Sequence, residues 1–257
     1  MKAAGLSYQE AGSGEVPIIC LHGIGGNACS FAPQLRALSD DHRIISVDLP
    51  GYGGSDPIAL SFEALADKVA DLVDALGVGQ AHLCGHSIGG MIAIETACRH
   101  PTKVASLALI ATTSAFGGRD DHFRDAFIAA RLTPLDQGQT IEDLAKTFVP
   151  EIVGPNADAS VMADATATMA AVPEATYRAI VRCLVTFDRR ADIAGLTQPA
   201  CLIAGAQDLN APARTMARMA EKMGVTCHQI DGAGHLVNLE AAGETNRILR
   251  DFYRRLP

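Results

Sequence analysis

A serine between two glycines is the first feature of this 257-residue sequence that could do chemistry. Ser87 stands in the Gly-His-Ser-Ile-Gly segment at residues 85–89, directly after the apolar residues 81–84. A strand-to-helix turn of this kind raises the serine hydroxyl above the sheet, and the glycines let strand and helix pack closely. The N–H groups and dipole of the following helix would stabilise negative charge at the turn. The segment therefore predicts a nucleophile; its alternative interpretation is a glycine-rich structural loop.

A nucleophilic serine needs a histidine to take its proton and a carboxylate to orient that histidine. His235 has the most suitable context, because it follows the small residues 232–234 after the last expected strand. The alternative for His235 is a histidine in a surface loop. Six further histidines lie within an expected strand, inside the serine turn or in less suitable contexts, and they are His42, His82, His86, His100, His122 and His228.

The carboxylate best placed for this role is Asp208. Three residues separate it from the expected strand 200–204, and it precedes a helix that begins near Pro212. Loops at the carboxyl ends of parallel strands bring distant side chains together at one edge of a sheet. We therefore expect Asp208 to contact His235.

Other acids are open alternatives for the same role. Asp48 also follows an expected strand, but residues 49–55 are typical of a structural turn. Asp188 and Asp192 stand near the end of a long helical region, and residues 111–113, which follow another expected strand, contain no carboxylate. The sequence therefore favours Asp208 without excluding Asp48.

The elements that must position these residues follow an alternating pattern. Apolar runs without polar alternation are typical of parallel strands covered on both faces, and they lie at residues 18–21, 44–47, 81–84, 104–110, 200–204 and 227–230. Residues 62–76 predict a helix with Ser61 at its N-cap and Gly77 at its end. Residues 6–9 predict a further strand, joined to the next one by a hairpin turn. Such alternation predicts an α/β fold with a parallel sheet.

The alternation stops after residue 110 and resumes at residue 200, before a final helix at 241–255. Between these points the pattern predicts four helices, at residues 121–131, 142–148, 159–171 and 174–187. Thr140 with Asp143 resembles a capping box, and Pro173 suits a first helical position. We therefore expect a core of residues 1–113 and 191–257 and a helical cap insertion at 114–190.

Composition limits the partners. The formal charge of −8 is spread along the chain, which argues against nucleic acid or an anionic membrane as partner. No apolar run approaches the roughly 18 residues of a membrane span, and the start of the chain has no apolar leader core, so a cytoplasmic location is expected. The seven cysteines include no C-x-x-C pair and are expected to be buried, reduced thiols. The oligomeric state stays open.

Taken together, these motifs resemble the α/β-hydrolase family over essentially the whole chain. Besides the serine segment, the sequence carries His-Gly-Ile-Gly-Gly at residues 22–26 and Asp-Leu-Pro-Gly-Tyr-Gly-Gly-Ser-Asp at 48–56, each after an expected strand. The resemblance implies an α/β-hydrolase fold, with a mostly parallel central sheet flanked by helices and a helical cap inserted after the sixth strand. It also assigns the oxyanion hole to the backbone N–H groups of Ile24 and Ile88, with His22 as a residue that organises the loop.

The same resemblance bears on the chemistry. Related dehalogenases and epoxide hydrolases carry aspartate at the nucleophile position, where this chain has Ser87. No His or Cys cluster has metal-ligand spacing, and the glycines of residues 23–26 lack the dinucleotide spacing, so neither a metal nor another cofactor is expected. Cleavage of a small-molecule ester or lactone through an acyl-enzyme is the expected reaction.

Within the family, the sequence looks most like 3-oxoadipate enol-lactonases. C–C bond hydrolases of the meta-cleavage type often have Trp beside the histidine and Arg soon after the acid, where this chain has Leu236 and residues 209–211. A C–C bond hydrolase and a non-hydrolytic receptor or lyase remain alternatives. Cap arginines that could bind a substrate carboxylate, or simply be solvated, are Arg119, Arg124 and Arg131, together with Arg178 and Arg182.

Overall fold

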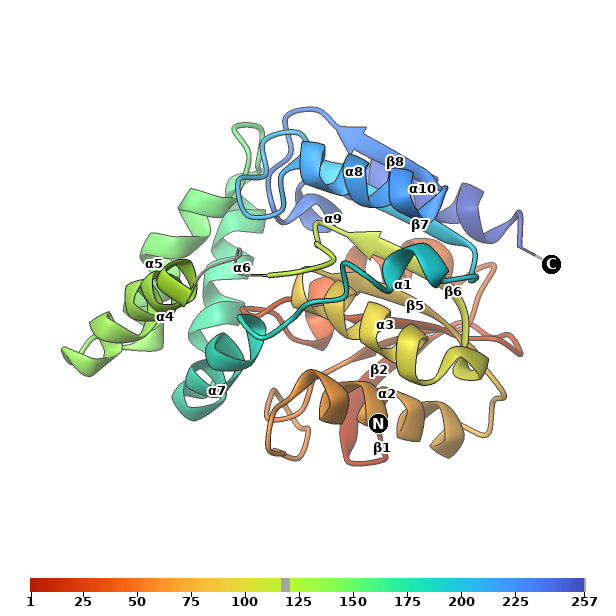
Figure 1. The fold of residues 1–257 in the computed structure, drawn as a ribbon, viewed down its shortest axis with the longest axis horizontal. Coiled ribbons are helices and arrows are strands. Elements are labelled where there is room, and N and C mark those ends of the chain that lie inside the picture. Colours follow the sequence, from red (N-terminus) through yellow and green to blue (C-terminus); the bar gives the residue numbers. More distant parts are fainter. Residues whose placement is uncertain (117–120, 257) are drawn as a thin grey trace.

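The structure is a computed structural model, and it describes residues 1–116 and 121–256 (Figure 1). Its described strands form one eight-stranded sheet in the order β1-β2-β4-β3-β5-β6-β7-β8. The strands are β1 (Lys2–Ala3), β2 (Leu6–Ala11), β3 (Ile18–Leu21), β4 (Ile44–Val47), β5 (Ala81–His86), β6 (Val104–Ile110), β7 (Ala200–Gly205) and β8 (Thr226–Ile230). All pairs among β3 to β8 are parallel. The strand β1 pairs antiparallel with β2, and β2 pairs antiparallel with β4. The predicted mostly parallel α/β sheet is confirmed.

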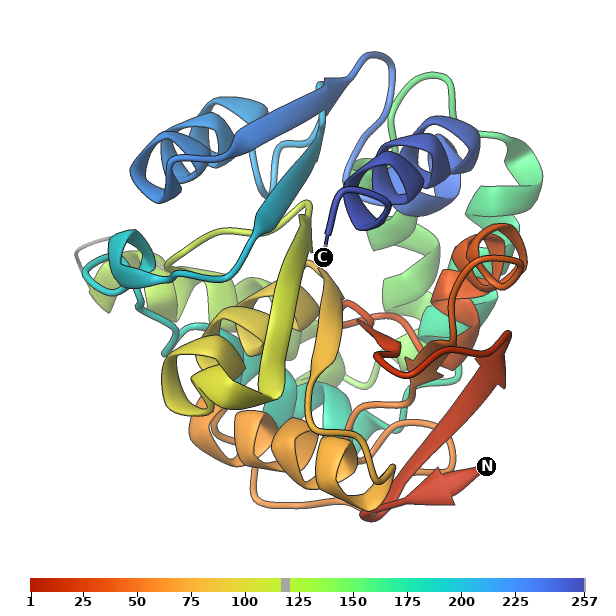
Figure 2. The same cartoon turned by 90° about the vertical axis from the view of Figure 1, so that its right-hand side faces the viewer.

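Helices cover both faces of this sheet, as Figure 2 shows. Side chains of α2, α3 and α8 belong to the core on one face, and side chains of α1 and α10 to the core on the other. Outside the segment between β6 and β7, the α-helices of the described residues are α1 (Ala32–Leu38), α2 (Phe62–Ala75), α3 (Ile88–Arg99), α8 (Ala213–Met223), α9 (Val237–Glu240) and α10 (Ala242–Tyr253). Both faces of β3 to β7 are therefore largely shielded from water, which explains their continuous apolar runs, whereas the edge strand β8 is partly exposed.

The helix α2 shows how the sequence sets these boundaries. The Ser61 hydroxyl accepts a hydrogen bond from the Ala64 N–H at 3.1 Å and so caps the helix start, as predicted. Leu65, Val69 and Val73 then recur on the buried face. At the other end Gly77 takes a φ of 70°, which a glycine adopts without strain.

In the described part of the segment between β6 and β7 lie four α-helices, which we call the cap helices: α4 (Asp121–Asp136), α5 (Ile141–Ile152), α6 (Ala159–Ala170) and α7 (Glu174–Leu184). They lie on the side to which the parallel strands point (Figure 1). The predicted capping box of α5 is confirmed, because Thr140 and Asp143 exchange both hydrogen bonds. The insertion after the sixth strand thus brings helices over the carboxyl ends of the sheet, while the boundaries 114 and 190 stay predictions.

Two local expectations are wrong, and two short elements were not predicted. The hairpin from residues 6–9 to β3 does not form, because β4 and β5 occupy both sides of β3 and leave β2 to pair with β4. Pro173 stands at the N-cap of α7, one position before the expected one. The two-residue strand β1 and the single turn α9 are too short to leave a periodic pattern. None of these changes moves the carboxyl ends of the strands.

Candidate active site

Ser87 lies between β5 and α3 with a backbone φ of 55° and ψ of −121°. Non-glycine residues rarely adopt this conformation, which costs about 1–3 kcal/mol unless the surroundings enforce it. Its N–H donates to the Ile110 carbonyl at 2.9 Å, and its carbonyl accepts from the N–H of Gly90 at 2.9 Å. The turn is therefore held from β6 on one side and from α3 on the other.

The flanking glycines are required by close backbone contacts. A Cβ at Gly85 would overlap the Gly89 carbonyl, and a Cβ at Gly89 would overlap the Leu21 carbonyl of β3. A Cβ at Gly90 would lie 2.6 Å from the Thr112 methyl group. Side chains at these positions would separate α3 from the sheet, so the glycines are what permit the strained turn at Ser87.

His235 and Asp208 meet Ser87 at this point. The His235 Nε2 lies 3.0 Å from the Ser87 Oγ, and the Nδ1 lies 2.8 Å from the Asp208 Oδ2. His235 is 8% exposed and Asp208 is 3% exposed. An ionised carboxylate can only accept, so Nδ1 carries the proton and Nε2 faces the hydroxyl as an acceptor. This geometry allows the imidazole to take the serine proton.

The environment of Asp208 keeps it ionised. Burial raises the pKa of this carboxyl group, but the neighbouring His235 and the N–H groups of Ala211 and Asn210 outweigh it and leave the pKa below its usual value. The Oδ1 accepts from the Asn210 N–H at 2.8 Å and from the Ala211 N–H at 3.0 Å. The tight turn after β7 therefore fixes one oxygen and leaves the other for His235.

The alternative acids have other partners. The Asp48 carboxylate accepts from the N–H groups of Ala28 at 2.8 Å and Gly54 at 3.3 Å, and so organises two loops. Asp188 pairs with Arg190, and Asp192 pairs with Arg189. Among the described residues, the carboxylate that contacts His235 is that of Asp208.

The loop after β3 lies close to Ser87. A Cβ at Gly23 would lie 3.4 Å from the Ser87 Cβ. Next to it, His22 accepts the Leu49 N–H at Nε2 (3.0 Å) and donates from Nδ1 to the Gly23 carbonyl (2.7 Å). Burial lowers the pKa of His22 to about 4, so it stays neutral and can make both bonds. His22 therefore organises the loop, as the sequence indicated.

Two backbone N–H groups in segments next to Ser87 have no acceptor among the described residues. Ile88 is the first residue of α3, so its N–H has no partner within the helix. In the described part of the chain, neither the Ile24 N–H nor the Ile88 N–H donates a hydrogen bond to another residue. The Tyr52 hydroxyl donates to the Ile24 carbonyl at 2.8 Å and holds the loop in place. Both N–H groups thus remain available to a ligand.

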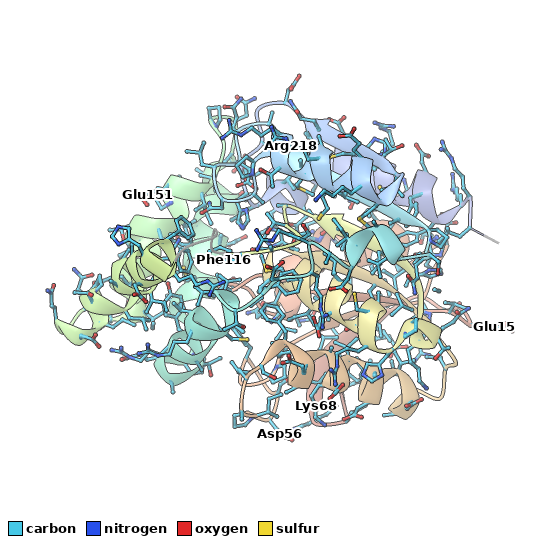
Figure 3. The ribbon with its side chains drawn as sticks, in the orientation of Figure 1. Glu15, Asp56, Lys68, Phe116, Glu151 and Arg218 are labelled. Carbon is cyan, nitrogen blue, oxygen red and sulfur yellow. The ribbon has the colours of Figure 1, made fainter. Side chains whose placement is uncertain are left out.

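A cavity of about 570 Å³ opens over Ser87 between the core and the cap helices. Its wall includes the apolar side chains of Phe116, Phe127, Phe148 and Met169, and Phe116 is labelled in Figure 3 where cap and core meet. The volume is typical of a site for a small molecule. On the cap side, the Met169 side chain reaches the loop after β3 and would lie 3.1 Å from a Cβ placed at Gly25.

The three arginines expected to bind substrate differ in position. Arg131 lines the cavity, whereas Arg124 is not among its described lining residues. Arg119 lies outside the described residues. Of the other two candidates, Arg178 pairs with Asp136 and Glu174 on the cap surface, and Arg182 is exposed.

The expectation that the cysteines are buried is wrong for Cys29. Its side chain is exposed and lines the cavity, and its sulfur accepts from the Gln9 Nε2 at 3.1 Å. Cys98 and Cys227 are half-buried. The remaining four cysteines are buried, and they are Cys20, Cys84, Cys183 and Cys201.

Two residues that the sequence reasoning did not assign hold the His235 loop. The Glu240 carboxylate accepts from Gly234 (2.8 Å) and Leu236 (2.9 Å), the two neighbours of His235, and from Gly154 beyond α5 (2.7 Å). His86 donates from Nε2 to the His235 carbonyl at 2.8 Å, and burial lowers the pKa of His86 to about 3. No residue pattern in the sequence reveals either role, because both side chains bind backbone groups.

Neither a resident metal nor a spanning helix is indicated by the described residues. Residues 1–116 and 121–256 contain no group of three or more His, Cys, Asp and Glu side chains that could hold a metal ion. Within the same ranges no helix has both the length and the apolar character needed to cross a membrane.

With this geometry in view, comparison with known proteins identifies the family. Residues 16–242 match the family described as the alpha/beta hydrolase fold. The chain therefore belongs to the α/β-hydrolase fold family, and its class is that of hydrolases with this fold.

Similar proteins carry several names. A protein of Variovorax paradoxus (strain S110) carries the name carbamate hydrolase RutD. It is 31% identical to this chain, over 98% of this chain and 97% of its own length. The dihydrolipoyllysine-residue acetyltransferase component of the acetoin cleaving system of Pseudomonas putida is 29% identical over 96% of this chain. The chain spans 66% of the length of that second protein.

Solved structures show the same fold. A thermophilic esterase from Thermogutta terrifontis superposes with a TM-score of 0.87 at 24% identity, covering 98% of this chain and 93% of the esterase. The enol-lactonase from Burkholderia xenovorans LB400 gives a TM-score of 0.85 at 23% identity, with coverage of 97% and 96%. At such identities the likeness establishes the fold alone.

Proposed function

We propose that this protein is a serine hydrolase that cleaves a carboxylic ester or lactone of a small molecule through an acyl-enzyme. Ser87 is the nucleophile, His235 the base and Asp208 the acid that orients it. The N–H groups of Ile24 and Ile88 form the oxyanion hole. The unbroken row of contacts from Asp208 through His235 to Ser87, at 2.8 and 3.0 Å, is the observation that carries the proposal.

The reaction proceeds in two halves. His235 Nε2 removes the Ser87 proton while Oγ attacks the carbonyl carbon, and the resulting oxyanion accepts from the two N–H groups. The protonated His235 then gives its proton to the leaving alcohol, or to the ring oxygen of a lactone. Water, deprotonated by the same histidine, attacks the acyl-enzyme and regenerates Ser87.

A carbamate is the second candidate substrate class. It is favoured by the relative from Variovorax paradoxus, which is named a carbamate hydrolase. The similarity covers nearly the full length of this chain and of the relative. The carbamate carbonyl would be attacked in the same way, with an amine or ammonia released in place of an alcohol. C–C bond cleavage and a receptor or lyase role lack a comparable observation.

The proposed setting is the cytoplasm. All seven cysteines are free thiols, which agrees with a reducing compartment. The cavity size agrees with a small-molecule substrate.

Turnover of three substrate types tests the proposal. We expect p-nitrophenyl acetate and the aromatic lactone dihydrocoumarin to be hydrolysed by the wild-type protein, with loss of nearly all turnover in Ser87→Ala. Ethyl carbamate, followed by ammonia release, tests the second candidate. Binding without turnover of any ester, lactone or carbamate would contradict the hydrolase assignment and favour a receptor.

A further inference from the structure

Arg131 places a positive charge in the wall of the cavity that contains Ser87. It stands on α4, where its guanidinium carbon lies 3.6 Å from the centre of the Phe127 ring and 5.2 Å from that of Phe148. Phe116 packs edge-on against Phe127 at 4.6 Å between ring centres. Phe127 and Phe148 therefore hold the guanidinium group in the cavity wall, and Phe116 supports the Phe127 ring.

Among the side chains that the structure describes, the Arg131 guanidinium group has no anionic partner. No carboxylate of residues 1–116 and 122–256 lies within ion-pair distance of this group, whereas Arg178 and Arg189 each pair with two acids. Glu151, labelled in Figure 3, lies exposed on α5. Its carboxylate attracts the Arg131 charge without contacting the guanidinium group. A half-buried cation held in this way is stabilised when an anion enters the cavity.

The other charged side chains of the cavity wall belong to its rim. Arg36 and Asp164 are both exposed, and they carry opposite charges. Water screens exposed charges, so this pair gives little net preference for an anion. The preference of the cavity for an anionic substrate therefore depends on Arg131.

We propose that Arg131 binds a carboxylate of the substrate, so that the natural substrate is an anionic ester or lactone. This inference rests on the proposed function and specifies its substrate class. With one face of the guanidinium on the Phe127 ring, the N–H donors in its plane remain for a bidentate pair with a carboxylate. The cap then selects substrates that carry an acid group at a distance from the carbonyl that Ser87 attacks.

Two esters that differ in one group test this selection. Mono-p-nitrophenyl adipate and p-nitrophenyl hexanoate have acyl chains of equal length, and only the first ends in a carboxylate. We expect the wild-type protein to have the higher kcat/KM for the adipate ester. Arg131→Met should lower this value about 10–100-fold and leave that for the hexanoate ester within about threefold, as for loss of a charge-assisted pair. Arg131→Lys should fall between the two.

Arg182→Met is the matched control, because Arg182 is an exposed cap arginine that does not line the cavity. It should leave the ratio of the two kcat/KM values unchanged. An unchanged ratio in Arg131→Met, or an equal loss for both esters, would overturn the inference while leaving the hydrolase function intact. If the wild-type protein hydrolyses neither ester, the proposed function fails, and calorimetric binding of adipate to Ser87→Ala then decides the anion site. Loss of that binding in Ser87→Ala/Arg131→Met supports the site, and equal binding overturns it.

Discussion

Replacing Glu240 by glutamine tests whether the His235 loop is positioned by one carboxylate. Oε2 of Glu240 accepts from Gly154 and Gly234, and Oε1 accepts from Leu236. Glutamine keeps one oxygen and turns the other into an NH₂ donor. The amide oxygen will take the side with two N–H groups, which leaves the Leu236 N–H facing another donor and makes the two remaining bonds neutral.

The size of the effect follows from these bonds. A hydrogen bond to a charged group contributes about 1.5–3 kcal/mol, and a neutral one about 0.5–1.5. One bond lost and two weakened by about 1 kcal/mol each amount to about 3.5–5 kcal/mol, and water at the half-exposed Glu240 lowers this to about 2–4 kcal/mol. Because a shift of about 1 Å in a catalytic group can lower the rate 100-fold, we expect kcat for p-nitrophenyl acetate to fall about 10–100-fold. Urea unfolding and steady-state kinetics measure the two effects.

Glu244→Gln provides the control. Glu244 lies exposed on α10 and pairs with Arg247 only at 3.7 Å, so its replacement should change stability by less than about 0.5 kcal/mol and leave kcat unchanged. If Glu240→Gln behaves like Glu244→Gln in both assays, Glu240 does not position His235 and the reasoning is wrong.

Ser87→Gly should abolish ester turnover. It should also raise the free energy of unfolding by about 1 kcal/mol, because glycine adopts a φ of 55° without strain. If urea unfolding shows that the variant is less stable than the wild type, the turn is not strained. Asp208→Asn should lower kcat about 10⁴-fold by misplacing the His235 proton, whereas Asp48→Asn should mainly lower the free energy of unfolding. If Asp48→Asn loses kcat and Asp208→Asn keeps it, Asp48 is the acid. Burial lowers the pKa of His22 to about 4 and that of His86 to about 3, so the unfolded chain binds these protons first as the pH falls. The free energy of unfolding should therefore be greatest above pH 6.5 and drop by about 1.4 kcal/mol per pH unit for each of them between pH 6.5 and the folded pKa, and equal urea midpoints at pH 7 and pH 5 would contradict this.

Much of the fold could be predicted from the sequence because local signals and burial agree. The continuous apolar runs of β3 to β7 reflect strands that are dry on both faces. Ser61 and Thr140 mark helix starts because their side chains bond the N–H groups of the first turn. Where the pairing depends on which sheet edge is free, as for β2, the local pattern carried no information.

The candidate site was foreseeable to the extent that its geometry follows the strand order. Ser87, Asp208 and His235 each follow a parallel strand, so topology brings them to one edge, although their catalytic roles stay predictions. The cap differs, because no local pattern says which face of α4 turns inward. Only the packing of Phe127 and Phe148 around Arg131 distinguishes this residue from Arg178, which pairs at the surface.

Glu240 shows a second limit of sequence reasoning. Its three N–H partners come from two segments that are 80 or more residues apart in the chain, on either side of the contact between cap and core. A carboxylate that binds backbone groups depends on no particular partner side chain, so residue types alone do not reveal it. Such a contact appears only when the fold brings the two backbones together.

Covalent labelling with diethyl p-nitrophenyl phosphate tests the central claim most directly. This phosphate ester reacts with an activated serine and releases p-nitrophenol, leaving a stable phosphoryl group on the nucleophile. We predict one group per chain, located on Ser87 by peptide mass spectrometry, with loss of ester turnover in proportion to labelling and no labelling in Ser87→Ala. Full inactivation with the label on another residue, such as the exposed Cys29 of the same cavity, would contradict the assignment of Ser87 as the nucleophile.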